Sequence, residues 1–356
     1  METWLEFNFH DRAAMRVSRA APTAPQLEDI FEGFLDSGLK NHDLTVVGEY
    51  EQLVQPSHSE HELRFTDDSL LITSTGVQVT RRDGRFEVRG TRELLTSVLP
   101  LVDCLMTAKG APMIHAATID LGGRGIFLPA AGGVGKTSTV AKLMRHSGAG
   151  FLGDDWGFLS SDGDLLGFPK PMFVKPHHRP IYPHLFQAKR KPLIPKKFSK
   201  SIGKMTTLVH PFVTKYPRVA GITRRWSPEH IMVTPQEAFP GMRMATSAPL
   251  TLAIFVERYD GDVALLEERS SSWMASRALG NFHAELASHS RDLLTALATS
   301  GVMPIEGFFA EKSEILNKAL FEKPNFLLRV PGKFSADHAS DVIVEHVFHA
   351  LELVGE

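Results

Sequence analysis

The chain has 356 residues, of which 43% are hydrophobic and 22% are charged, a composition typical of a globular protein with a large core. Its single cysteine, Cys104, excludes an internal disulfide and is typical of a reducing compartment. No apolar run approaches the roughly 18 residues that a membrane helix needs, and the acidic start of the chain is not that of a secretory signal. We therefore expect a cytoplasmic protein without a membrane partner.

The formal net charge of −2 conceals a basic block. Residues 165–228 contain no Asp or Glu but fourteen Lys or Arg. Such a block concentrates positive potential and attracts anions. It indicates either a solvated face or, as we favour, a segment that binds an anionic partner. The aromatic residues within it match no nucleic-acid-binding signature, so we do not expect nucleic acid as that partner.

The predicted elements begin with a helix over 25–39. Short β-runs separated by turn residues predict a meander over 62–90. Apolar residues at helical spacing then predict a helix over 91–109. Residues 1–110 are thus expected to form an α+β N-terminal region.

The rest of the chain alternates between strand and helix patterns. Strands are predicted over 113–120, 125–128, 151–155, 156–160, 165–168, 250–258 and 326–330. Helices are predicted from Lys136 onward and over 273–288, 291–299 and 336–353. We expect an α/β fold with a core over 111–265, into which the basic block is inserted, and a largely helical C-terminal α/β region over 266–356.

The strand over 125–128 runs directly into a glycine-rich loop, Ala130-Ala131-Gly132-Gly133-Val134-Gly135-Lys136-Thr137. Glycines let backbone N–H groups close around phosphate oxygens, the lysine reaches the terminal phosphates, and the threonine hydroxyl suits Mg²⁺. A helix that starts here points its positive end at the same anion. The standard motif has glycine where Ala130 stands, but the strand before and the helix after it are the context that the motif requires.

This loop predicts a site for ATP with Mg²⁺; the alternative is a glycine-rich turn that binds nothing. The residues expected to bind the nucleotide are Gly132, Gly133, Val134, Gly135, Lys136, Thr137 and Ser138.

Two adjacent carboxylates, Asp154 and Asp155, follow the apolar residues 151–153. Phosphoryl transfer needs a metal ion to neutralise phosphate charge and a base to orient the acceptor hydroxyl. One aspartate is expected at the metal and the other at the acceptor proton. The alternative is a turn pair that caps a hairpin.

His115 interrupts an otherwise apolar strand and is either a satisfied core residue or a part of the site. Its strand is expected to neighbour the one that feeds the loop, which favours the site. Lys175 and Arg179 are weaker candidates for contacts to a phosphate or an acidic substrate. The other histidines show no metal-ligand spacing, so no zinc site is expected.

Several of these segments, taken in order, resemble the core of HPr kinase/phosphorylase and related kinases. They are Ile114-His115-Ala116-Ala117, the loop Gly-Gly-Val-Gly-Lys-Thr, and Phe151-Leu152-Gly153-Asp154-Asp155. The resemblance covers about residues 114–175. The N-terminal region does not resemble the regulatory domain of those enzymes, so HPr itself is not implied as the substrate.

This resemblance implies a mixed-sheet core like that of phosphoenolpyruvate carboxykinase. It implies Lys136 on the phosphates, Thr137 on Mg²⁺, and the aspartate pair near the metal and the acceptor serine, with Asp154 favoured as the base and Asp155 at the metal. His115 matches the strand histidine of the family, which favours it as a further catalytic residue. A homo-oligomer is compatible with it.

The leading hypothesis is an ATP- and Mg²⁺-dependent kinase that phosphorylates a hydroxyl, namely a serine of an acidic protein or peptide. Two alternatives remain open. One is a kinase of an anionic small molecule, and the other is a binding module that nucleotide switches without any transfer.

Overall fold

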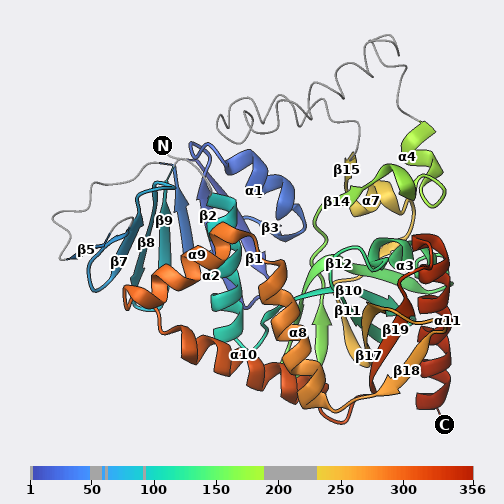
Figure 1. Ribbon diagram of the computed structural model, residues 1–356. Helices are drawn as coiled ribbons and strands as arrows, with labels where there is room; N and C mark the ends of the chain where they lie inside the picture. Colours follow the sequence, from blue (N-terminus) through green and yellow to red (C-terminus); the bar gives the residue numbers. More distant parts are fainter. Residues whose placement is uncertain (1–2, 49–57, 61–62, 91–93, 188–230, 356) are drawn as a thin grey trace, which may run out of the picture. The chain divides into compact units, whose positions relative to one another are not determined.

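The computed structural model describes residues 3–48, 58–60, 63–90, 94–187 and 231–355. The chain divides into two compact units, Met1–Lys170 with Gly241–Glu356, and Pro171–Pro240. The first unit is mixed α/β with two large sheets (Figure 1), which confirms the predicted α/β class. Most of the basic block lies outside the described residues, so its proposed role stays a prediction.

The first sheet has nine strands among the described residues, in the order β3-β1-β2-β4-β9-β8-β7-β6-β5. Their bounds are β1 Trp4–Phe9, β2 Ala13–Ser18, β3 Leu35–Asp36, β4 Leu44–Val47, β5 His58–Glu60, β6 Leu63–Phe65, β7 Ser69–Ile72, β8 Val77–Arg82 and β9 Arg85–Arg89. The antiparallel run β6–β9 confirms the predicted meander. The β1–β2 hairpin was not predicted, although buried and half-buried residues alternate through β1 and most of β2, which is a strand pattern.

The helix predicted over 25–39 is wrong in length. α1 spans only Ala24–Ile30 and is followed by the 3₁₀ turn η1, Glu32–Phe34. Gly33 and Gly38 weaken the helical pattern, and Gly38 has a positive φ of 82°. The residues between them, Leu35 and Asp36, pair with β1 instead.

Helices α2 Leu94–Ala108, α9 Ser288–Thr299 and α10 Ile305–Leu320 pack together beside this sheet (Figure 1). α2 and α9 confirm the predicted helices, whereas α10 was not predicted. Its buried face carries Lys312, which interrupts the apolar pattern. Lys312 is fully buried and pairs with Asp103 of α2 at 2.6 Å, which explains how a charged residue fits there.

The second sheet follows the order β11-β10-β12-β13-β17-β19-β18 and mixes parallel with antiparallel pairs. The bounds are β10 Met113–Leu121, β11 Gly125–Pro129, β12 Ala149–Leu159, β13 Asp164–Leu166, β16 Arg243–Met244, β17 Ser247–Tyr259, β18 Leu265–Glu268 and β19 Asn325–Pro331. The β10–β11 hairpin and the β17 strand confirm their predictions. β19 and β18 join this same sheet, so the boundary expected at residue 265 falls at the start of β18.

One strand prediction is wrong in a way that matters for the site. Residues 151–155 do not end a strand, because β12 continues through Leu159 in register with β10. Asp154 and Asp155 therefore lie in the middle of a buried strand, opposite Ala117 and Ala116.

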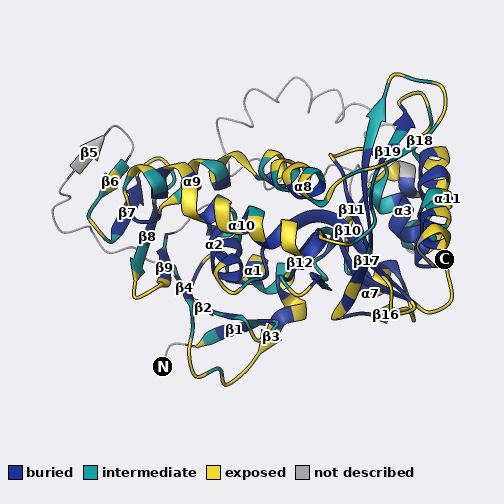
Figure 2. Cartoon of the chain, turned by 90° about the horizontal axis from the view of Figure 1, so that it is seen from below, coloured by how far each residue is buried: buried dark blue, intermediate teal, exposed yellow. Residues whose placement is uncertain are grey.

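Helices cover both faces of the second sheet. α3 Lys136–Leu143 and α11 Ala336–Gly355 pack together on one face, and α8 Ser271–Glu285 with α10 lies on the other (Figures 1 and 2). The strands β10 and β11 are wholly buried (Figure 2). This layering is typical of a sheet whose strand ends carry a site.

The second unit contains a strand pair, β14 Met172–Val174 with β15 Ile231–Val233, and short helices. These are η2 Pro176–His178, α4 Pro183–Gln187 and α7 Pro235–Ala238. Tyr182 is buried against Phe239 within this unit. Across the described part of the whole chain, no helix is long and apolar enough to cross a membrane.

Candidate functional site

The glycine-rich loop joins the end of β11 to the first turn of α3, as the sequence predicts. Gly133 and Gly135 adopt φ values of 81° and 120°, a region that favours glycine. Gly135 is the N-cap of α3, so the first backbone N–H groups of the helix have no partner within the helix itself. The local geometry is that of an anion cradle.

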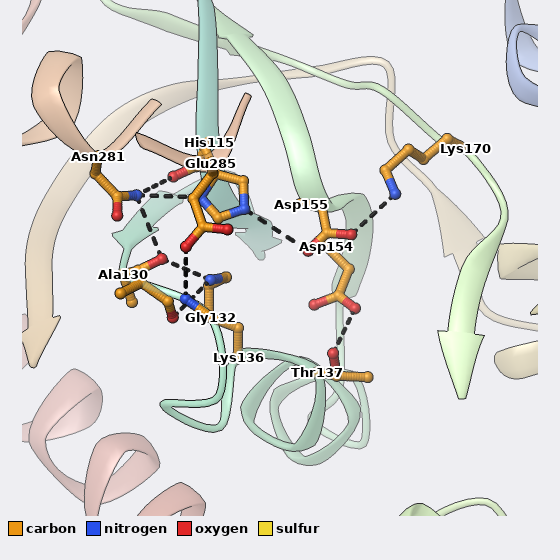
Figure 3. Close-up of polar contacts among 11 residues, drawn as sticks. His115, Ala130, Gly132, Lys136, Thr137, Asp154, Asp155, Lys170, Asn281 and Glu285 are labelled. Carbon is orange, nitrogen blue, oxygen red and sulfur yellow. Dashed lines mark hydrogen bonds and ion pairs between the residues drawn. The ribbon is translucent and has the colours of Figure 1, made fainter. Parts of the chain in front are cut away.

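Lys136 folds back over the loop that carries it. Its Nζ donates to the carbonyl oxygens of Ala130 at 2.6 Å and Ala131 at 3.1 Å (Figure 3). Burial lowers the pKa of Lys136, opposed by the negative charges of Asp155 and Asp154. The ammonium group thus lies between the loop and the two carboxylates.

Thr137 donates from Oγ1 to Asp154 Oδ2 at 2.8 Å (Figure 3). Asp154 is only 7% exposed, and its other oxygen, Oδ1, is buried without a hydrogen-bond partner in the described residues. Burial, followed by the charge of Asp155, raises the pKa of Asp154 to about 7. A buried carboxylate oxygen without a partner is costly, and a cation at this point would remove the cost.

The donor set at Asp154 fits Mg²⁺ rather than a metal held by protein alone. In the described parts of the chain, no group of three or more His, Cys, Asp or Glu could hold an ion. Mg²⁺ needs only one or two carboxylates, and takes its remaining ligands from substrate phosphates and water. Asp154 and Thr137 could supply such a partial set beside the glycine-rich loop.

Asp155 lies beside Asp154 but makes different contacts. Lys170 Nζ lies 2.9 Å from Asp155 Oδ2, and His115 Nε2 lies 3.9 Å from Asp155 Oδ1 (Figure 3). Its side chain is 38% exposed to solvent, whereas Asp154 is buried.

An irregularity in β12 explains how neighbouring strand residues reach one site. Successive side chains of a regular strand point to opposite faces. The β10–β12 register shifts opposite Thr118 and Ile119, and a Cβ on Gly153 would lie 2.4 Å from the carbonyl oxygen of Trp156. This close approach requires glycine at 153, and the bend leaves both carboxylates near the loop (Figure 3).

His115 is held by α8 through a residue that the sequence did not point to. Asn281 Nδ2 donates to His115 Nδ1 at 3.1 Å, to the carbonyl oxygen of His115 at 3.2 Å and to that of Ala130 at 3.3 Å. Burial, followed by the charge of Lys136, lowers the pKa of His115 to about 4. The ring is therefore neutral, and because Nδ1 accepts, Nε2 carries the proton that faces Asp155.

Glu285, the last residue of α8, completes the cluster. The backbone N–H of Gly132 donates to Glu285 Oε1 at 2.8 Å (Figure 3). Asn281 and Glu285 are four residues apart and so share one side of the helix. No motif marks Asn281 or Glu285, and this spacing is their only sequence signal. Lys170 lies within the stretch 114–175 that carries the family resemblance, but the sequence did not assign it to the site.

The remaining predicted residues take different places. Val134 and Ser138 have buried side chains, so they can offer only backbone N–H groups to a ligand. Lys175 and Arg179 belong to the second unit, not to the unit that carries the loop. Their substrate role stays a prediction.

No family model matches this chain, and a search of curated proteins finds no similar sequence. The functional assignment therefore depends on the residues of the site and their geometry.

Proposed function

We propose that this protein is an ATP- and Mg²⁺-dependent phosphotransferase with a phosphate-loop core of the HPr kinase and phosphoenolpyruvate carboxykinase type. One observation carries the proposal. The threonine that ends the phosphate loop is hydrogen-bonded to a buried aspartate whose other oxygen has no partner in the described residues, and a second, accessible carboxylate lies beside it. Phosphoryl transfer needs one group that binds the metal ion and one that accepts the proton of the substrate hydroxyl, and a pair of carboxylates can provide both.

In this proposal Asp154 and Thr137 hold the metal, the reverse of what the resemblance alone implies for the two aspartates. Bound Mg²⁺ neutralises charge on the phosphates of the nucleotide. Thr137 fixes one Asp154 oxygen and leaves Oδ1 for the ion. Lys136, now bonded to loop carbonyls, turns to the phosphates when they occupy the cradle.

Asp155 accepts the proton of the substrate hydroxyl. The hydroxyl oxygen then forms a bond to the γ-phosphorus while the bond from that phosphorus to the β–γ bridging oxygen breaks, which releases ADP. Lys170 orients the Asp155 carboxylate from one side, and the Nε2–H of neutral His115 faces it from the other. Asn281 keeps that proton on Nε2, which makes it a positioning residue.

The proposed acceptor is a serine of an acidic protein or peptide, in line with the basic block over 165–228. An anionic small molecule remains the alternative acceptor.

Transfer from γ-labelled ATP tests the proposal. Purified protein is incubated with Mg²⁺ and a lysate of the source cells, comparing wild type with Lys136→Ala, Asp154→Asn and Asp155→Asn. Asp292→Asn, an exposed aspartate on α9, is the matched control. We expect a labelled product with wild type and Asp292→Asn, and about 100-fold less with Asp155→Asn, which removes the general base. Lys136→Ala and Asp154→Asn should also lower the yield strongly at limiting Mg²⁺, because they remove contacts to the phosphates and the metal.

The nature of the product separates the hypotheses. A labelled peptide or protein supports the serine acceptor, and a labelled small molecule supports the alternative. ATP binding without any transfer, unaffected by Asp155→Asn, would contradict the enzyme and leave a nucleotide-switched binding module.

A further inference from the structure

The anion cradle of the loop already holds a negative group. The Gly132 N–H, one of the groups that the motif offers to phosphate, donates to Glu285 Oε1 at 2.8 Å. The same carboxylate lies beside the Gly132 Cα, since a Cβ there would be in ordinary van der Waals contact with Oε1, at 3.6 Å. Burial lowers the pKa of Lys136, and the negative charge of Glu285 is among those that oppose this shift. A carboxylate oxygen thus lies where the loop would place a phosphate oxygen.

The Lys136 ammonium group is also bonded within the chain. Its Nζ donates to the carbonyls of Ala130 and Ala131 instead of pointing away from the loop. Two of the donors that would hold phosphate, one from the backbone and one from a side chain, are thus satisfied from within the chain. This satisfaction keeps the cradle formed without a ligand.

We infer that Glu285 is an internal substitute for a nucleotide phosphate, which must leave the loop before a nucleoside triphosphate can bind. This inference rests on the proposed function and adds a means of regulating the same site. Two negative groups cannot share one N–H donor, and their charges repel at this distance. Every nucleotide that enters therefore displaces the Glu285 carboxylate.

The surrounding contacts confine the movement to one side chain. Glu285 is exposed and ends α8, so its carboxylate can turn into solvent without disturbing the sheet. Asn281, one turn earlier, bonds to His115 and Ala130, and Phe282 is buried against Trp156. These contacts hold the helix while its last residue moves.

The test measures binding of Mg·ATP and of magnesium pyrophosphate to the full chain by calorimetry. The variants are Glu285→Gln, which keeps the shape but removes the charge, and Glu285→Ala. Glu311→Gln, an exposed glutamate on α10, controls for the change in net charge. We expect both Glu285 variants to bind each ligand about tenfold more tightly, equivalent to ~1.4 kcal/mol, with Glu311→Gln unchanged.

Equal or weaker binding by both Glu285 variants, with clear binding by wild type, would overturn the inference and leave the proposed function intact. Tighter binding by these variants with no phosphate transfer in any of them would support the inference and contradict the phosphotransferase. No binding of either ligand by any variant would overturn both.

Discussion

Asp154 and Asp155 are neighbours in the chain, yet their surroundings give them different chemistry. Asp154 is buried and shares a hydrogen bond with Thr137. Its other oxygen has no partner within the described part of the chain, which suits a cation. Asp155 is accessible and lies between Lys170 and His115, which suits a proton acceptor. Burial thus separates two identical side chains into two roles, a general way in which proteins tune carboxylates.

Replacing Asp154 and replacing Asp155 should change the Mg²⁺ dependence of phosphate transfer in different ways. Asp154→Asn is expected to raise the Mg²⁺ concentration needed for half-maximal transfer by about 10–100-fold. Asp155→Asn should leave that concentration unchanged and lower turnover at saturating Mg²⁺ by about 10²–10⁴-fold, because it removes the base. Steady-state kinetics across a Mg²⁺ titration gives both values. The opposite pattern would restore the assignment that the family resemblance implies.

At the scale of elements, α8 and α10 connect the two sheets of the first unit. Lys312 of α10 is buried, pairs with Asp103 of α2, and lies 3.3 Å from the ring centroid of Phe282 on α8. Asp103 also accepts from the backbone N–H of Met113, at the start of β10. Burial raises the pKa of Asp103 and lowers that of Lys312, and each charge opposes the shift of the other. One ion pair thus joins α2, α8, α10 and β10.

Removing only one partner of this ion pair should destabilise the folded protein. Lys312→Ala is expected to lower the free energy of unfolding by about 3–5 kcal/mol, because it leaves the Asp103 charge buried without its positive partner. The double variant Lys312→Met with Asp103→Asn removes both charges and keeps an acceptor for Met113, so it should recover most of this loss. Urea unfolding measures all three proteins. A double variant as unstable as Lys312→Ala would contradict the account.

At the scale of the whole first unit, His10 lies where the two sheets pack against each other. His10 Nε2 donates to the carbonyl oxygen of Gly167 at 2.8 Å, and its ring contacts Phe34 and Phe158. The pKa of His10 is lowered from its ordinary value, and burial is the largest cause of this shift. The folded protein therefore favours a neutral ring at this position.

This shift predicts a loss of stability in mild acid. Below the ordinary histidine pKa of about 6.5, the unfolded chain binds a proton that the folded chain does not, so the free energy of unfolding falls as the pH decreases through this range. His10→Asn keeps an amide donor and tolerates the local φ of 55°, and should reduce the slope. Urea unfolding at pH 7.5 and pH 5.5 gives the comparison. Equal slopes for the two proteins would show that His10 does not contribute.

The sequence by itself determined the features that depend on residues close together in the chain. The glycine-rich loop between a strand and a helix, the β10–β11 hairpin, the meander and most helices follow from local spacing, because backbone conformation is encoded over a few residues. It did not predict α10, since Lys312 reads as a surface residue until Asp103 is placed against it.

Only the tertiary structure decided how the site is completed. Asn281 and Glu285 lie about 150 residues beyond the loop, and no local pattern brings α8 to it. The contrast between Asp154 and Asp155 likewise depends on the bend at Gly153 and on packing against α3. Burial and long-range contact set the charge state and the partners of these side chains, and both exist only once the chain has folded.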